Sequence, residues 1–247
     1  MSLLQRLFGK ENDQSAFVEP EIAAAILRWR GRAATDLTQP IATQPWLVVD
    51  VETTGLDMRR DQLLAIGAVV MEPDAIQFQH TFEIVLKQDV PSRIDNILVH
   101  RIGGGEQLAG SAPAAALAAF LDFADDMPCI AFHADFDEAM LRRAYRQYLD
   151  IDFAPRFIDL AFLAPALVND APKNLRSLDD WIDYFSITIF ARHCAVADAL
   201  GTAQLFLALR ARRERSYRRT VVRAGTRSTL VEHAVATLAL SKNNIDK

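Results

Sequence analysis

The sequence has little cysteine and no long apolar run, and each shortage excludes a class of protein. Its two cysteines, Cys129 and Cys194, are too few for a disulfide framework and lack the spacing of a metal site, which is typical of a reducing compartment. No apolar stretch reaches the roughly 18 residues that a transmembrane helix needs, and the polar N-terminus is not typical of a signal peptide. We therefore expect a cytoplasmic protein with no membrane partner.

Composition and charge indicate a packed protein whose positive charge is concentrated in one segment. With 247 residues and 51% hydrophobic content, the chain suffices for one sizeable domain with extensions or for two small domains, and a disordered or fibrous chain is excluded. The net charge of -5 argues against a polyanionic partner, yet the segment Arg210–Arg227 carries eight arginines and one acid, Glu214. A phosphate-contacting patch and a solvated helix end both fit that segment.

Two carboxylates interrupt an otherwise apolar segment, Trp46-Leu-Val-Val-Asp-Val-Glu-Thr-Thr-Gly-Leu56. Residues i and i+2 of a strand point to the same face, so Asp50 and Glu52 project together. Buried strands almost never carry charges unless these are paired or bound to a metal. The pair therefore predicts an oxygen site for hard divalent cations such as Mg²⁺.

Hydrophobic periodicity predicts a sheet that is followed by alternating helices and short strands. Three strand patterns, 46–51, 63–71 and 76–86, have short connections, which favours an antiparallel meander. A helical pattern that begins at Pro20 and that Gly31 can end precedes them. The later elements are a helix from Ser111, a strand over 129–133, a helix over 137–150, a strand over 157–160, a helix from Ser177 and a helix over 195–212. We expect an α/β fold of the ribonuclease-H-like type, with a mixed sheet of three antiparallel strands and then βα units, flanked by helices.

Three more residues can reach the first pair in such a fold. Asp137 begins a helix directly after an apolar strand, so its carboxylate lies at the carboxyl end of a strand, where open α/β sheets bind ligands. Asp198 lies in the first turns of the last helix. His193 precedes Asp198 by five residues and belongs to the lead-in loop, from which it can swing toward a metal-bound water while Asp198 stays a fixed ligand.

These segments resemble the three motifs of the DnaQ-like, or DEDDh, 3′→5′ exonucleases. That family includes the proofreading epsilon subunit of bacterial DNA polymerase III, RNase T and oligoribonuclease, and the resemblance covers residues 45–210. The first motif is similar to Asp50-Val-Glu-Thr-Thr-Gly-Leu56, the second to Phe136-Asp-x-x-Met-Leu141, and the third to His193-x-x-x-x-Asp198-Ala. Three motifs in this order within one domain are far more specific than any one of them.

The resemblance implies a role for each matched residue. The catalytic groups would be four carboxylates that bind two Mg²⁺ or Mn²⁺ ions, and one general base: Asp50, Glu52, Asp137, Asp198 and His193. Asp135 is a rival for the ligand of the second motif, but Asp137 keeps the motif's register. The tyrosine branch of the family has Tyr where this chain has Cys194, which favours the histidine branch.

Substrate contacts are implied for the first motif, the middle of the domain and the second motif, namely Thr53, Thr54, Gly55, Leu56, His100 and Phe136. Phe136 fits a core position equally well. The chain departs from many relatives at Ala65, where they have Glu, and at Phe132-His133, where they have His-Asn. These departures affect the support of the ligands and the hold on substrate more than the type of reaction.

The reaction implied is two-metal hydrolysis that releases nucleoside 5′-monophosphates from a nucleic-acid 3′ end. Resemblance to the epsilon subunit implies single-stranded DNA as substrate and suggests a DNA polymerase as partner. The alternatives are an RNA-trimming exoribonuclease, like RNase T or oligoribonuclease, and a non-catalytic member that binds nucleic acid or a polymerase through Arg210–Arg227. The expected organisation is an N-terminal helical extension, 1–44, an exonuclease domain, 45–212, and a basic C-terminal tail, 213–247.

Overall fold

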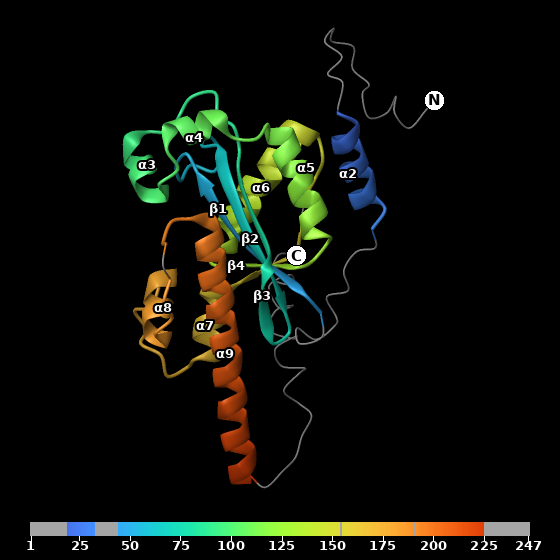
Figure 1. Cartoon of the computed structure of the whole chain (residues 1–247). Coiled ribbons are helices and arrows are strands. Elements are labelled where there is room, and N and C mark those ends of the chain that lie inside the picture. The colour runs from blue at the N-terminus through green and yellow to red at the C-terminus, as the bar shows by residue number, and fades with distance from the viewer. Residues whose placement is uncertain (1–18, 33–43, 154, 190, 225–247) are drawn as a thin grey trace, which may run out of the picture.

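A five-stranded mixed sheet forms the centre of the computed structural model, which describes residues 19–32, 44–153, 155–189 and 191–224, with side chains to residue 213. The strands follow the order β3-β2-β1-β4-β5. Figure 1 shows the sheet among its flanking helices. Their bounds are β1 Trp46–Thr53, β2 Leu63–Glu72, β3 Ala75–Val85, β4 Cys129–Ala131 and β5 Phe157–Asp159. The described helices are α2 Pro20–Arg30, α3 Ile94–His100, α4 Gly104–Ala109, α5 Pro113–Ala124, α6 Ala134–Leu149, α7 Leu160–Leu167, α8 Leu178–Phe185 and α9 Ala195–Ala224.

The antiparallel meander expected for the first three strands is confirmed. β1 pairs antiparallel with β2, and β2 pairs antiparallel with β3. β4 joins the other edge of β1 in parallel, and β5 joins β4 in the same way. Only Pro73 and Asp74 connect β2 to β3, which suits a hairpin, whereas a helix precedes each parallel strand. The sheet is therefore mixed and flanked by helices, as the periodicity predicts.

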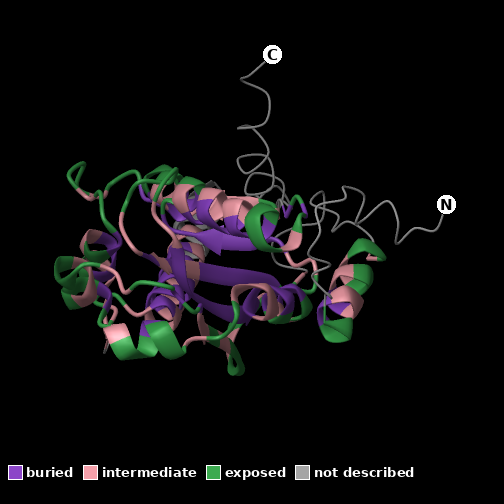
Figure 2. Ribbon diagram, turned by 90° about the horizontal axis from the view of Figure 1, so that it is seen from above, coloured by how far each residue is buried: buried purple, intermediate pink, exposed green. Residues whose placement is uncertain are grey.

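Alternation along β1 assigns its side chains to two separate cores. Leu47, Val49 and Val51 belong to the core shared with α5 and α6. Trp46 and Val48 belong to the core shared with α7, α8 and α9. The buried strands, purple in Figure 2, lie between these helices. Since side chains two residues apart share a face, the row that begins with Trp46 and Val48 continues along the α9 side toward the carboxyl end of β1.

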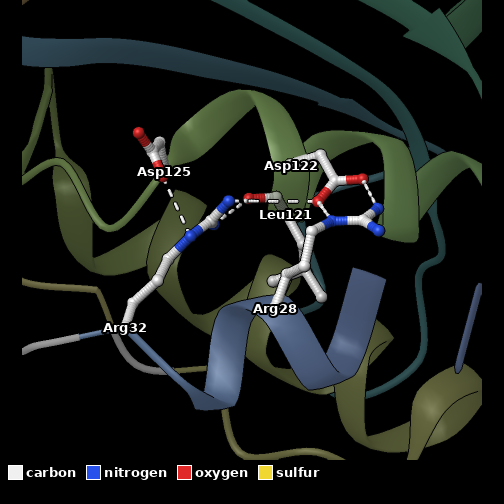
Figure 3. Close-up of polar contacts among 5 residues, drawn as sticks. All are labelled: Arg28, Arg32, Leu121, Asp122 and Asp125. Carbon is white, nitrogen blue, oxygen red and sulfur yellow. Dashed lines mark hydrogen bonds and ion pairs between the residues drawn. The ribbon is translucent and has the colours of Figure 1, made fainter. Parts of the chain in front are cut away.

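The N-terminal helix expected from the sequence is confirmed as α2, which packs against α5 (Figure 3). Apolar side chains of the two helices form a small cluster. Arg28 donates to the carboxylate of Asp122 through Nε at 3.0 Å. Arg32 pairs with Asp125 at 2.9 Å and donates to the carbonyl oxygen of Leu121 at 3.0 Å. Both apolar burial and ion pairs therefore hold α2 on the domain.

Several helices differ from the expectations based on periodicity. α3, α4 and α7 have six to eight residues each, too few for a helical period to stand out in the sequence. The helix expected from Asp137 begins at Ala134, so that Asp137 occupies its first turn. α9 continues to Ala224, because no glycine or proline lies between position 212 and Gly225. The domain boundary expected after residue 212 therefore falls inside one continuous helix.

No helix in the described part of the chain combines the length and the apolar character that crossing a membrane requires. Much of the expected N-terminal extension and basic tail falls on residues 1–18, 33–43 and 225–247, which lie outside the described residues.

Candidate active site

Asp50 and Glu52 continue the row of β1 side chains that faces α9. They follow Trp46 and Val48 on the same face of the strand, at the point where the apolar core ends, and both are partly buried. The alternation of the strand thus brings the two carboxylates together at the carboxyl end of β1, as their spacing predicts. The buried side chains directly before them in the same row anchor this end of the strand.

The first turn of α9 lies against β2 at Gly67, the residue directly opposite Asp50. A Cβ atom at this glycine would overlap the backbone of Ala195 and Val196. A residue without a side chain therefore lets the helix approach the strand this closely. The contact brings Asp198, three residues further along α9, next to the carboxylates of β1.

Asp50, Glu52 and Asp198 form one carboxylate cluster. One oxygen atom from each side chain lies within 4.8 Å of the other two. Asp198 is 5% exposed, so this carboxylate is largely removed from water. Carboxylate oxygens are the ligands that hard divalent cations prefer, and at these separations they can share one ion. The structure therefore brings together three of the four carboxylates that the motifs predict as ligands.

Asp137 reaches the same end of β1 from α6. The parallel partner β4 ends at Ala131, whereas β1 continues to Thr53, so backbone N–H groups of β1 beyond that point need other acceptors. Asp137 Oδ1 accepts the N–H of Val51 at 3.1 Å, and the Asp137 side chain is buried. Its place in the first turn of α6 favours a negative charge. The fourth predicted carboxylate thus lies beside the strand that carries Asp50.

His193 lies on the loop that precedes α9, as its spacing from Asp198 predicts. Its backbone adopts a φ of 59°, in the left-handed region, and the residue is exposed. Its N–H donates to Asp198 Oδ2 at 3.0 Å. On the same loop, the guanidinium of Arg192 contacts the Asp198 carboxylate and also donates to Asp179 Oδ1 at 2.5 Å. The loop therefore holds Asp198 in place while the imidazole stays exposed.

Burial and mutual repulsion raise the pKa of the carboxyl groups in this site. Desolvation raises the pKa of Asp50 well above its usual range, and the charges of the other three carboxylates raise it further. Desolvation is also the main reason that the pKa of Glu52 rises to about 7. It likewise raises the pKa of Asp137 and that of Asp198. Bound cations offset such repulsion, and an all-oxygen donor set suits Mg²⁺ or Mn²⁺, so the residues fit divalent metal ions.

The last residue of β1 and the turn after it contain four of the predicted substrate contacts. Thr53 is buried, and its Oγ1 donates to the carbonyl oxygen of Gly55 at 2.6 Å. Thr54 Oγ1 donates to Asp61 Oδ1 at 3.2 Å. Both threonines therefore shape the turn itself. Leu56 is 86% exposed and presents its apolar side chain to solvent next to the carboxyl end of β1.

His100 and Phe136 are both at least partly enclosed. His100 is 2% exposed, its Nδ1 accepts the N–H of Ile102 at 2.9 Å, and its Nε2 lies 2.8 Å from Asn96 Oδ1. Since both ring nitrogens are bonded within α3 and the residues after it, this side chain orders that segment, and a polar contact with substrate would require breaking one of these bonds. Phe136 is half-buried and packs against the core shared with α5 and α6, in keeping with the core alternative.

Two charged residues near the site are not predicted by the motifs. Asp159, at the end of β5, accepts the N–H of His133 at 3.0 Å and that of Ala161 at 2.8 Å. After desolvation, its charge contributes to the raised pKa of Asp137. The other residue is Arg192. Local features of the sequence could have indicated both residues, because Asp159 ends a short apolar strand and Arg192 immediately precedes His193.

Curated relatives share sequence with about two thirds to three quarters of this chain. A PolC-type DNA polymerase III from Caldanaerobacter subterraneus subsp. tengcongensis is 30% identical over 164 residues, which are 66% of this chain and 11% of the relative. A DNA polymerase III subunit epsilon-like protein from Rhodobacter capsulatus is 30% identical over 185 residues, 73% of this chain and 26% of the relative. The chain thus spans about a tenth to a quarter of the length of these two relatives.

Solved structures of E. coli exonuclease I share the fold. The complex with a dT13 oligonucleotide has a TM-score of 0.60 and 18% identity, covering 70% of this chain and 42% of that one. The zinc-bound complex with single-stranded DNA has a TM-score of 0.61 and 19% identity over the same shares. The family model for exonucleases of the RNase T type matches residues 47–206. Because that match covers more than half of the chain and contains all five residues that the motifs predict as catalytic, the chain belongs to the exonuclease (RNase T) family.

Proposed function

We propose that this chain is a metal-dependent 3′→5′ exonuclease, which hydrolyses phosphodiester bonds at nucleic-acid 3′ ends and releases nucleoside 5′-monophosphates. The observation that carries the proposal is the meeting of Asp50, Glu52 and Asp198 within 4.8 Å, at the end of a strand that also receives the buried Asp137. Membership of the exonuclease family supports nuclease chemistry at this cluster.

Each residue has a defined part in the proposed reaction. The four carboxylates would hold two Mg²⁺ or Mn²⁺ ions, which supply an activated water and neutralise charge at the scissile phosphate. His193 would take the proton of the attacking water, because it is exposed on the loop beside Asp198 and imidazoles accept protons near neutral pH. The exposed Leu56 would contact the terminal base, since apolar side chains such as leucine can pack against bases.

Single-stranded DNA is the proposed substrate, and a DNA polymerase is the proposed partner. The exonuclease I structures of the same fold contain a dT13 oligonucleotide in one case and single-stranded DNA in another. The two relatives are DNA polymerase III proteins by name. RNA trimming of the RNase T or oligoribonuclease kind would use the same carboxylates. A direct comparison of the two nucleic acids therefore distinguishes these activities.

The test is a digestion assay on the purified full chain with matched single-stranded DNA, duplex DNA and short RNA, in Mg²⁺ and separately in Mn²⁺. A label at the 5′ end is expected to show fragments that shorten stepwise from the 3′ end, and a 3′ label is expected to appear as mononucleotide. Single-stranded DNA should be digested fastest. If RNA is digested faster, the exoribonuclease alternative replaces the proposed substrate.

Two variants show whether the carboxylates carry the reaction. Asp50→Ala should abolish release of mononucleotide, because it removes one of the three carboxylates of the cluster. Asp152→Ala is the matched control, since Asp152 is an exposed acid between α6 and β5 that pairs with Arg142. It should digest at the wild-type rate. A wild-type protein that releases no mononucleotide with either ion, or an active Asp50→Ala variant, contradicts the proposed function.

A further inference from the structure

Arg192 places a positive charge directly against the carboxylate cluster. Its guanidinium contacts Asp198 Oδ1 through Nη1, and its Nε donates to Asp179 Oδ1 at 2.5 Å. The Asp198 side chain is 7% exposed and that of Arg192 is 25% exposed, so water screens their interaction only weakly. Since Asp179 belongs to α8 and Asp198 to α9, the guanidinium bridges the two helices.

Both oxygens of Asp198 are engaged in this arrangement. Oδ1 contacts Arg192, and Oδ2 accepts the N–H of His193 at 3.0 Å. The same carboxylate supplies an oxygen within 4.8 Å of oxygens from Asp50 and Glu52. A divalent cation bound by this cluster would therefore lie near the guanidinium, and two positive charges at one buried carboxylate repel each other strongly.

We propose that Arg192 is a positioning residue that acts as an internal counter-cation of the site and competes with a divalent metal ion for Asp198. The inference rests on the proposed function, because it takes Asp198 to be a metal ligand. Before metal binds, Arg192 offsets the repulsion among the carboxylates and stabilises the fold. When metal binds, Arg192 gives up Asp198, and Asp179 keeps the guanidinium beside the site. Arg192 therefore lowers the affinity for metal.

A purely structural role for Arg192 makes a different prediction. If its bridge served only to hold the His193 loop between α8 and α9, removing either end of the bridge would loosen the loop and weaken metal binding. Competition predicts opposite effects at the two ends. Loss of Arg192 removes the charge that competes with the metal ion, so metal binds more tightly. Loss of the Asp179 charge leaves Asp198 as the remaining carboxylate partner of the guanidinium, so metal binds more weakly.

The test is Mn²⁺ binding to the full chain without nucleic acid, measured by calorimetric titration, together with thermal unfolding with and without Mn²⁺. Arg192→Gln should bind Mn²⁺ about tenfold more tightly than the wild type, and Asp179→Asn about threefold more weakly. Arg192→Lys keeps the positive charge, on which the competition depends, and should bind within about twofold of the wild type. Without metal, Arg192→Gln should melt at a lower temperature than the wild type, and Mn²⁺ should raise its melting temperature by more.

Arg212→Gln is the matched control for these variants. It breaks an ion pair of α9 with Asp170 at 2.6 Å, and it lies about 21 Å along the helix from Asp198 at 1.5 Å per residue. Its Mn²⁺ affinity should equal that of the wild type. If Arg192→Gln binds Mn²⁺ as the wild type does or more weakly, the inference is overturned.

The remaining outcomes are also decisive. If circular dichroism shows that Arg192→Gln does not fold, the Mn²⁺ affinity of Arg192→Lys decides. An affinity equal to that of the wild type supports competition. A loss of affinity as large as that of Asp179→Asn overturns it. A wild-type protein that binds no Mn²⁺ overturns the proposed function as well as this inference. A metal-binding wild type whose affinity does not respond to residue 192 overturns the inference alone.

Discussion

Gly67 lies directly opposite Asp50 in the β1–β2 pair, and the first turn of α9 rests on the backbone that this glycine leaves uncovered. Asp198 reaches the carboxylates of β1 because Ala195 and Val196 can touch the strand at this point. The geometry of the cluster therefore depends on a residue with no functional group. One missing side chain sets the distance between the helix and the sheet.

Replacing Gly67 by alanine is expected to lower nuclease activity about a hundredfold and stability by about 1–3 kcal/mol. The added methyl group collides with the backbone of α9, which must move away and carry Asp198 with it. Digestion rates and denaturant unfolding measure the two effects. Gly105→Ala is the control, because a Cβ atom at Gly105 has open space around it. An active and fully stable Gly67→Ala protein would contradict this account of how α9 is placed.

Replacing His193 by alanine should lower the rate of hydrolysis by about 10²–10⁴-fold and leave Mn²⁺ affinity unchanged. The backbone N–H of this residue, not its imidazole, bonds to Asp198, so the ligand keeps its support in the variant. Single-turnover digestion measures the rate, and calorimetric titration measures the affinity. Loss of metal binding together with activity would mean that the side chain supports the ligand and does not transfer a proton.

Metal-free protein should become less stable as the pH rises toward neutrality. Burial raises the pKa of Glu52 from 4.5 to about 7. The folded state then holds the Glu52 proton more tightly than the unfolded state does. The contribution of this proton to the free energy of unfolding is complete below about pH 4.5 and is lost as the pH rises through about 7. Melting temperatures in a chelator should fall over this range, and should fall less in Glu52→Gln. Equal pH dependence in the two proteins would be evidence against a raised pKa.

The ion pair between Arg28 and Asp122 should contribute only weakly to the docking of α2. Its side chains are 54% and 37% exposed, so water screens the attraction. A double-mutant cycle with Arg28→Gln, Asp122→Asn and both together, followed by denaturant unfolding, isolates the coupling. A coupling of zero would assign the docking to the apolar contacts around Ile22 and Ala118 instead.

Local spacing in the sequence is sufficient to predict much of the site. Asp50 and Glu52 share a face because they are two residues apart in a strand, and the structure confirms their meeting. His193 and Asp198 are separated by a short loop and one turn, so their relation is also local. The resemblance to DnaQ-like exonucleases rests on such short motifs, and the family match confirms it. The strand alternation and short connections likewise predict the mixed sheet.

Contacts between distant segments account for what the sequence does not reveal. Gly67 meets α9 across more than half of the chain, and no periodic pattern encodes that approach. Arg192 reaches Asp179 only because α8 folds back beside α9. His100 is a predicted substrate contact from the middle of the domain, yet its two ring nitrogens bond to Asn96 and Ile102, and those bonds become visible only when α3 is in place.

The register of β1 against β2 determines both which side chains enter the core and which side chains face the candidate active site. A slip of the strand by one residue would turn Asp50 and Glu52 into the core shared with α5 and α6, and would turn Val49 and Val51 toward α9. Burying two unpaired carboxylates in that core is strongly unfavourable. Asp50 and Glu52 therefore help to specify the register of β1 against β2. Once β1 has paired with β2 in this register, Asp50 and Glu52 already point toward α9.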